Sequence, residues 1–316
     1  MRSAVLVGPG KVRVEETAIP EPGFGEVRVR LEGCGLCSSN LPVWEGRPWF
    51  TYPMAPGAPG HEAWGRVDKW GEGVKGPKVG ERVAMLSYHG FSEYDIAAAE
   101  GVVALPPSLD GQPVPGEPLG CAMNIFSRSG IRPGDRVAVI GVGFLGAILT
   151  RLAVGTGATV YALARKPYAL EEAARCGART CLMDDHRKVL DRMSQLTGGT
   201  GCDVVIEATG MQWPLDVAGE LTRVRGRMVI AGYHQDGLRQ VNMQLWNWRG
   251  IDVINAHERD PSAYTHGIRE AVSAMGMGLL DPSRLYTHSY PLDRIAEGFE
   301  TMRQRPEGYF KAMVKI

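Results

Sequence analysis

The hydrophobic positions between residues 136 and 165 form three blocks of different character. A continuous apolar run at 137–140 meets a tight glycine cluster at 141–146. A longer apolar run with helix-compatible spacing follows, and then a segment rich in β-branched residues at 158–163. This order of strand, turn, helix and strand predicts a dinucleotide-binding βαβ unit.

The glycine cluster has the spacing G-x-G-x-x-G. Gly141 permits a tight turn, Gly143 lets the backbone approach a pyrophosphate, and Gly146 lets the helix pack closely on the strand. Phe144 and Leu145 begin the predicted helix, whose free N–H groups can bind an anion. A purely structural turn in an α/β sheet is the alternative, because chance matches are common in a glycine-rich chain.

The pattern elsewhere divides the chain into two parts. Short alternating runs separated by Gly and Pro predict a β-rich part up to about residue 120, with strands at 26–31, 63–67 and 82–86. Prolines cluster at 106–133 and place a boundary near residues 120–130. Beyond it, strand-like and helix-like runs alternate, which indicates a mostly parallel sheet. Its expected strands are 137–141, 159–163, 203–207, 227–231 and 251–255, with a helix at 168–176. A helix at 292–302 and a closing strand at 310–316 complete the expectations.

Charge and cysteine content narrow the possible partners. Lys plus Arg and Asp plus Glu both number 35, so no basic face for nucleic acid or an anionic membrane is expected. No apolar run approaches the roughly 20 residues that span a bilayer, and the N-terminal apolar core is short for a signal peptide. The six cysteines do not form a small-scaffold disulfide framework. We therefore expect a cytoplasmic protein with reduced thiols.

Three separated stretches carry residues that can bind a metal. They are the segment around Cys37, the Gly60-His61-Glu62 stretch and the segment around Glu117. One thiolate, one imidazole and one carboxylate can hold zinc with an open fourth position. Taken singly, each has an ordinary explanation as a buried thiol, a core histidine or a loop carboxylate.

The order of these stretches and the glycine cluster resembles the zinc-dependent medium-chain dehydrogenases, the alcohol and polyol dehydrogenase family. The resemblance covers nearly the whole chain and includes four further stretches, Gly80-Glu81-Arg82-Val83, Glu207-Ala208-Thr209-Gly210, Tyr290-Pro291-Leu292 and Lys311-Ala312-Met313-Val314. It implies a GroES-like β-rich catalytic domain, 1–122 completed by 281–316, and a Rossmann domain with a doubly wound parallel sheet, 123–280. The fold class is thus α/β plus β.

The resemblance also implies the site residues. Cys37 and His61 would bind zinc, with Glu62 or Glu117 completing the set directly or through water, and Cys121 as the competing third ligand. Ser39 would hand off the proton, with Glu62 beside it. Two further residues would contact the cofactor, Thr209 and, at the pyrophosphate, Lys311; a surface lysine is the alternative for Lys311.

Several departures from the family pattern are informative. The four-cysteine structural-zinc loop should fall between residues 86 and 92 and is absent, so one zinc per chain is expected. Pro42 replaces a histidine that relays a proton in many members. Asn40 stands where an aspartate often orients the zinc histidine, so that contact loses its charge. Cys34 and Cys37 form a C-x-x-C, but no βαβ setting supports a redox role.

The implied activity is hydride transfer between a nicotinamide cofactor and a secondary alcohol or ketone. A polyol, sugar or cyclitol-like substrate is expected. Trp44 and Trp246 are among the aromatic residues that could line a cleft, with a place in the core or at its rim as the alternative. His257 and Glu258 could contact hydroxyl groups, with a subunit interface as the alternative. Two rivals remain, namely a zinc-free quinone or enone reductase of the same fold and a non-catalytic nucleotide-binding protein. The strand at 251–255 should form a sheet edge, and the family resemblance implies a homodimer or homotetramer.

The residues at the end of the second strand of the βαβ unit, after 158–163, indicate which nicotinamide cofactor is bound. NAD-binding units usually carry Asp or Glu there to grip the ribose 2′-hydroxyl, but this chain has Ala164. Arg165 and Lys166 follow, and a guanidinium can bind a 2′-phosphate bidentately. We therefore expect NADP(H) to be preferred over NAD(H). If Arg165 is merely solvated, either cofactor remains usable.

Overall fold

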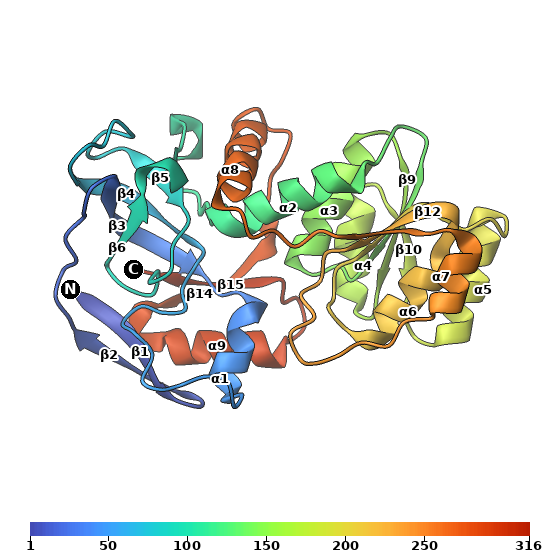
Figure 1. Cartoon of the computed structure of the whole chain (residues 1–316), viewed down its shortest axis with the longest axis horizontal. Coiled ribbons are helices and arrows are strands. Elements are labelled where there is room, and N and C mark those ends of the chain that lie inside the picture. Colours follow the sequence, from blue (N-terminus) through green and yellow to red (C-terminus); the bar gives the residue numbers. More distant parts are fainter. The chain divides into compact units, whose positions relative to one another are not determined.

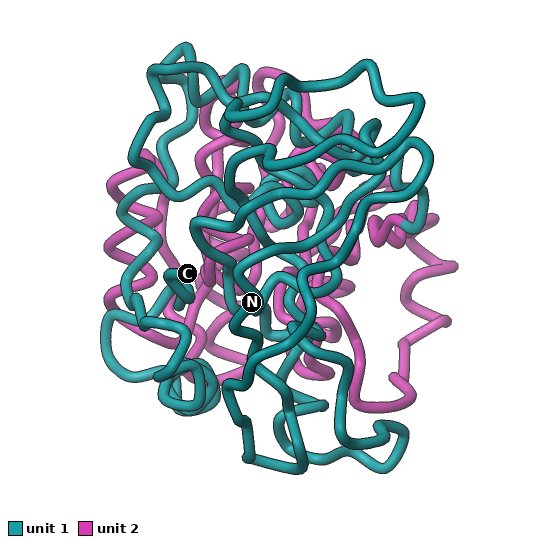
Figure 2. The backbone as a smooth tube through the Cα atoms, turned by 90° about the vertical axis from the view of Figure 1, so that its left-hand side faces the viewer, with its two compact units in different colours: residues 1–121, 259–316 teal, residues 122–258 magenta.

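The chain forms two compact units, each built from its own sheets and helices (Figures 1 and 2). A computed structural model describes all residues, 1–316. Unit 1 comprises residues 1–121 and 259–316, and unit 2 comprises residues 122–258. The first boundary lies beside the expected one at 122. The second does not lie at 281, because α8 (Pro261–Gly276) packs against elements of unit 1.

A close helix crossing explains the position of α8. Neither Gly267 of α8 nor Gly120 of α2 (Gly116–Ser129) has room for a Cβ, since each would overlap backbone of the other helix. The two backbones therefore touch at this point. No local hydrophobic pattern indicates such a contact, and the expected boundary at 281 came from the family resemblance.

Unit 1 is a mixed β structure. Its main sheet has the order β14-β15-β3-β4-β5-β7, with β6 paired to β3, and β1 and β2 form a separate antiparallel pair. The strands are β1 (Arg2–Gly8), β2 (Lys11–Glu16), β3 (Glu26–Gly35), β4 (Ala63–Trp70), β5 (Arg82–Met85), β6 (Tyr94–Ala98), β7 (Val102–Ala104), β14 (Tyr286–Pro291) and β15 (Lys311–Lys315). The helices are α1 (Leu41–Glu45), the start of α2, α8 and α9 (Ile295–Gln304), with short 3₁₀ turns η1 (Ser38–Asn40), η2 (Ala99–Gly101), η3 (Pro107–Leu109), η4 (Ser283–Leu285) and η5 (Leu292–Arg294).

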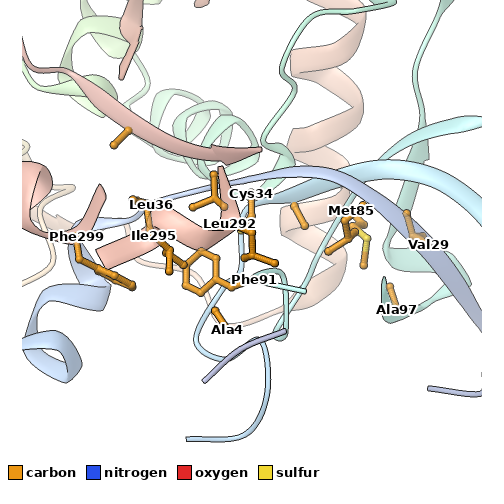
Figure 3. Close-up of a cluster of buried hydrophobic side chains, with 14 of the residues drawn as sticks. Ala4, Val29, Cys34, Leu36, Met85, Phe91, Ala97, Leu292, Ile295 and Phe299 are labelled. Carbon is orange, nitrogen blue, oxygen red and sulfur yellow. The ribbon is translucent and has the colours of Figure 1, made fainter. Parts of the chain in front are cut away.

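The core of unit 1 lies between the sheet and α9 (Figure 3). Leu36, Phe91 and Phe299 are among its buried side chains. Trp44 stacks on Phe299 with ring centroids 4.7 Å apart, and its indole N–H donates to Glu300 at 2.8 Å. Trp44 is therefore a core residue and does not line a cleft.

Unit 2 is a six-stranded parallel sheet with the order β10-β9-β8-β11-β12-β13. The strands are β8 (Arg136–Ile140), β9 (Thr159–Ala164), β10 (Arg179–Leu182), β11 (Cys202–Glu207), β12 (Thr222–Ile230) and β13 (Asp252–Asn255). The helices are α3 (Phe144–Gly155), α4 (Pro167–Arg175), α5 (His186–Thr197), α6 (Gln212–Leu221) and α7 (Met243–Arg249). This is the doubly wound order of a dinucleotide-binding domain, as the sequence predicted.

Strands β8, β9 and β11 are buried on both faces, which is why they read as continuous apolar runs. Ala138, Ile140 and Tyr161 belong to one core cluster with residues of α5 and α6. Trp246 is partly buried and packs against the same cluster. The sequence analysis missed β10, a four-residue strand with a single buried position. No helix of the chain is both long enough and apolar enough to cross a membrane.

Candidate functional site

Cys37, His61 and Glu62 come together at one corner of the unit 1 sheet. Their ligand atoms all lie within 4.8 Å of one another. The register explains the convergence, because β3 and β4 are antiparallel and Cys34 pairs with Ala63. Cys37 follows the end of β3, whereas His61 and Glu62 directly precede β4. Two strand ends that meet by pairing thus deliver a thiol, an imidazole and a carboxylate to one point.

A backbone carbonyl orients the His61 ring. Nδ1 of His61 lies 2.9 Å from the carbonyl oxygen of Pro59, which can only accept, so Nδ1 carries the proton. Nε2, on the opposite side of the ring, is the nitrogen that can bind a metal once it has lost its proton. The Asn40 amide donates to the same carbonyl at 3.2 Å, and its oxygen accepts the backbone N–H of Cys37 at 3.3 Å. Asn40 therefore braces the histidine through Pro59 and does not contact the ring itself.

Glu62 is fully buried and forms an ion pair with Lys311, which is 4% exposed. The Lys311 Nζ donates to Oε1 at 2.8 Å and lies 2.6 Å from Oε2. Burial alone would lower the pKa of Lys311, but the charges of Glu62 and Cys37 outweigh it and raise that pKa. A Cβ on Gly35, at the end of β3, would overlap Oε2 of Glu62, so glycine is required there. Lys311 thus sits beside the metal-binding corner and is not exposed as a surface lysine would be.

Glu117 and Cys121 lie near this corner but outside the group of three. They are four residues apart on α2 and so share a helix face. Burial, followed by Glu62, raises the pKa of Glu117 against the opposing effect of His61. Burial, followed by the charges of Glu117 and Cys37, raises the pKa of the Cys121 thiol well above its ordinary value. Of the two glutamates, Glu62 is the one whose carboxylate lies in the group of three.

The charges of the group strongly affect His61. Burial opposes its protonation, but contact with Cys37 and the charges of Glu117 and Glu62 raise the pKa of His61 to about 10. The Ser39 hydroxyl lies 3.5 Å from Nε2 of His61, on the side that faces the thiol.

The connection between β5 and β6 consists of residues 86–93 and contains no cysteine, so the chain lacks a four-cysteine loop there. All six cysteines are free.

In unit 2, the glycine cluster forms the expected turn between β8 and α3. Gly141 has φ +95° and no room for a Cβ beside Thr209, and Gly146 has none beside the Gly141 carbonyl. Gly143 is exposed, and nothing lies within 4 Å of where its Cβ would be. It is the N-cap of α3, and no side chain caps the helix N–H groups. The cradle therefore has room for an anion at the N-terminus of α3, where Phe144 and Leu145 begin.

The end of β9 carries the residues expected to choose the cofactor. Ala164 is buried, and Arg165 and Lys166 are exposed directly after it. Lys166 is the N-cap of α4. Thr209 follows β11, at the same edge of the parallel sheet, and its hydroxyl donates to Glu207.

The structure adds His234 and Arg239, which the sequence analysis did not single out, beside Glu207. Glu207 is fully buried, and it accepts hydrogen bonds from the Thr209 and Gly210 N–H groups and from His234. Arg239 donates to His234 in turn. The available signal was the polar run that directly follows the predicted strand 227–231, to which the sequence analysis assigned no role.

Known proteins resemble this chain over its whole length. Residues 23–107 match the alcohol dehydrogenase GroES-like domain, and residues 145–273 match the zinc-binding dehydrogenase family. The (R,R)-butanediol dehydrogenase of Bacillus subtilis (strain 168) is 30% identical over 354 residues, covering 100% of this chain and 99% of the relative. The sorbitol dehydrogenase of Homo sapiens is 28% identical over 337 residues, covering 96% and 92%.

A solved structure gives the same result at the level of the fold. That of 2R,3R-butanediol dehydrogenase from Bacillus subtilis superposes with a TM-score of 0.85 at 27% identity, covering 100% of this chain and 99% of that one. The two matched stretches lie one on each side of the proline-rich region 106–133. The chain belongs to the zinc-dependent medium-chain alcohol and polyol dehydrogenase family, and it is an enzyme of that class.

Proposed function

We propose that the protein is a zinc-dependent oxidoreductase that transfers a hydride between a nicotinamide cofactor and a secondary alcohol or ketone. The observation that carries the proposal is the convergence of Cys37, His61 and Glu62 within 4.8 Å. A thiolate, an imidazole and a carboxylate are a donor set that suits zinc with an open position. The Nδ1 proton of His61 is held by Pro59, which leaves Nε2 as the free donor atom.

These residues fit a single catalytic metal. Cys37, His61 and Glu62 would hold it, and Glu117 is near enough to replace Glu62 or to act through a water. Bound zinc would supply Lewis-acid polarisation of the substrate oxygen. Lys311 neutralises Glu62 in the unloaded site and can compensate whatever charge the carboxylate retains.

Ser39 is proposed to hold the substrate hydroxyl proton. Its Oγ lies 3.5 Å from Nε2 of His61, next to the free donor atom of the ring. A hydroxyl both accepts and donates, so it can pass a proton on toward solvent. Pro42 has no titratable group, so this chain lacks the histidine relay at that position.

The cofactor is proposed to be NADP(H), with NAD(H) usable. The turn at Gly141–Gly143 and the uncapped α3 terminus support a pyrophosphate site. Ala164 offers no carboxylate to a ribose, whereas Arg165 is exposed where a 2′-phosphate would lie. We expect kcat/KM to favour NADP(H), and Arg165→Ala to remove that preference. A preference that survives the substitution would exclude Arg165 as its source.

The substrate is proposed to be a polyol or a related polyhydroxylated compound. The relatives named above act on sorbitol and butanediol, which have several hydroxyl groups. His257 follows β13 and stacks on Tyr233, with ring centroids 5.3 Å apart. Glu258 comes next in the chain, and the side chains of His257 and Glu258 are proposed to recognise hydroxyl groups of the substrate.

The cytoplasmic location of the protein stays a prediction.

Assembly is proposed to proceed through β13, giving a homodimer or homotetramer. Strand β13 is the last of the unit 2 sheet and pairs with β12 alone. Such an edge offers backbone groups to a second copy of itself. Sedimentation that shows only monomer at micromolar concentration would exclude this arrangement.

Metal analysis combined with a polyol panel tests the proposed function. We expect one zinc per chain, and dehydrogenase activity that is lost with the metal in Cys37→Ser. A matched substitution, Cys176→Ser at the C-cap of α4 in unit 2, should retain both the zinc and the activity. Full activity without metal would instead support a zinc-free reductase, and cofactor binding without turnover on any alcohol would support a non-catalytic protein.

A further inference from the structure

The loop that follows β12, residues 231–241, is fastened to the end of β11 by a buried polar cluster. Glu207 accepts from the backbone N–H of Thr209 at 2.6 Å and of Gly210 at 3.0 Å, and from Nε2 of His234 at 3.0 Å. Its side chain is fully buried, and that of His234 is 15% exposed. One carboxylate therefore ties together the segments that follow two adjacent strands.

Arg239 fixes the tautomer of His234. Its Nε, which can only donate, lies 2.8 Å from Nδ1, so Nδ1 must accept and the proton must be on Nε2. That proton points at Glu207. Arg239 also donates to the Gly210 carbonyl at 2.7 Å and contacts Asp236. We call Glu207, His234 and Arg239 the clasp.

The clasp holds backbone against backbone. A Cβ on Gly232 would overlap the Gly210 nitrogen, and one on Gly210 would overlap the Tyr233 carbonyl oxygen. A Cβ on Gly141 would overlap the Thr209 side chain. The turns after β8, β11 and β12 are thus in contact one after another, along the carboxyl edge of the parallel sheet where nucleotides bind.

The position of the clasp identifies the half of the cofactor that it serves. A dinucleotide lies across the two halves of such a sheet, and the ribose that Ala164 and Arg165 would face belongs to the β8-β9-β10 half. The β11-β12-β13 half is then left for the nicotinamide half. The fastened loop carries Tyr233, which is 57% exposed and stacks on His257 after β13.

We propose that the Glu207–His234–Arg239 clasp is a positioning device that sets the Tyr233–His257 ring pair beside the nicotinamide half of the cofactor. The inference rests on the proposed function, because it needs a nicotinamide cofactor to act on. None of the three clasp residues has to touch the cofactor. Their effect is on where the loop and its aromatic wall lie.

The same unit contains a matched control. His186 donates through Nε2 to Glu220 at 2.9 Å, and its Nδ1 accepts from the Trp213 indole N–H at 2.9 Å. This is the same tautomer with the same kind of partners, but it joins α5 to α6 and not the turns at the carboxyl edge. Loss of His186 reproduces the loss of two histidine hydrogen bonds without moving loop 231–241.

The test compares intact cofactor with its adenosine half. Dissociation constants for NADPH and NADH, and for 2′,5′-ADP and AMP, are measured by fluorescence or calorimetry for wild type, His234→Ala, His234→Gln and His186→Ala. We expect His234→Ala to weaken intact-cofactor binding by about tenfold to a hundredfold, the effect of losing hydrogen bonds to a charged group. Fragment binding should change by less than about twofold, as should both affinities in His186→Ala. His234→Gln, which keeps a donor for Glu207, should recover most of the loss.

The outcomes separate the two proposals. If wild type binds neither NADPH nor NADH, the proposed function fails. If wild type binds and His234→Ala weakens fragment and intact cofactor equally, or no more than His186→Ala does, the positioning role is wrong. Should His234→Ala not fold, Arg239→Gln is measured in the same way, and hydrogen exchange of wild-type loop 231–241 must slow more with intact cofactor than with the fragment. Equal slowing would overturn the inference.

Discussion

Each unit of the molecule buries one glutamate completely, and the two carboxylates are satisfied in different ways. Glu62 in unit 1 faces a single side-chain cation, Lys311, and lies within reach of Cys37 and His61. Glu207 in unit 2 is held mainly by backbone N–H groups and one histidine. A carboxylate that is paired with a side-chain cation can exchange that cation for a metal ion. A carboxylate that accepts hydrogen bonds from backbone N–H groups cannot release those groups unless the loop that carries them unfolds.

The comparison separates a reactive site from a structural one. Burial and a negative charge are common to both, so neither property alone identifies chemistry. The difference lies in the neighbours, because only Glu62 has a thiol and an imidazole beside it. The following predictions alter one side of the comparison at a time.

The largest effect is expected from breaking the buried ion pair. In metal-free protein, Glu62→Gln leaves Lys311 charged and unpaired, and should lower the free energy of unfolding by about 3–5 kcal/mol. The double variant Glu62→Gln, Lys311→Met removes both charges and should recover most of that loss. Urea denaturation measures both. Lys315→Met, an exposed lysine on the same strand, is the control and should be nearly neutral; a double variant no more stable than the single one would contradict the pairing argument.

Neutralising the other glutamate should cost less. Glu207→Gln keeps one oxygen for the Thr209 and Gly210 N–H groups but turns an amide N–H₂ toward Nε2–H of His234. We expect a loss of about 1.5–3 kcal/mol in the free energy of unfolding, again by urea denaturation. Glu220→Gln, the partly exposed partner of His186, should lose less than about 1 kcal/mol. Equal losses would mean that burial does not make the Glu207–His234 contact more important than the partly exposed Glu220–His186 contact.

The binding of zinc to Cys37, His61 and Glu62 should release protons. The pKa of His61 is raised to about 10 in the unloaded site, so the ring is protonated at neutral pH and must lose its proton to bind zinc. Apparent zinc affinity should therefore rise about tenfold per pH unit up to that pKa, and level off above it. Calorimetry in buffers of different ionisation enthalpy should record at least one proton released per zinc. His61→Ala should release one proton fewer per zinc than wild type, and an unchanged count would contradict a protonated His61 that loses its proton to the metal.

The smallest effect concerns a third buried carboxylate, Asp95, which contacts His89. Burial opposes its ionisation, but hydrogen bonds from His89, Ser87 and the backbone outweigh it and lower the pKa of Asp95. The hydrogen bond to Asp95 raises the pKa of His89 above its ordinary 6.5, against burial. The stability that the protonated His89 contributes through Asp95 is present in full below pH 6.5, and it is lost as the pH rises through the raised pKa of His89.

Half of the His89 side chain is exposed, so the change should stay below about 1 kcal/mol. Unfolding free energies of wild type and His89→Asn should therefore converge as the pH rises. For Asp95 the sign is opposite, since its contribution is lost as the pH falls through its lowered pKa. A difference between the two proteins that grows with pH would refute the assignment.

Local pattern was sufficient for most strands of unit 2 and for part of the site. Strands buried on both faces read as apolar runs, and glycine spacing located the turn at Gly141. The metal-binding stretches were also recognisable, because each has its own short motif. Lys311 was assigned to a pyrophosphate by resemblance, since its pairing with Glu62 spans most of the chain and leaves no local trace. His234 was missed for the same reason. Its role depends on its contacts with Glu207 and Arg239, and the sequence of a loop does not reveal those contacts.

The lack of space at Gly35 links two distant positions in evolution. A side chain there would occupy the place of the Glu62 carboxylate, so the two residues compete for one volume. Family members that carry a larger residue at the position of Gly35 should carry a smaller or differently directed one at that of Glu62. Substitution histories should show these two positions changing together, and an ancestor crossing between the two states would pass through one that lacks the carboxylate.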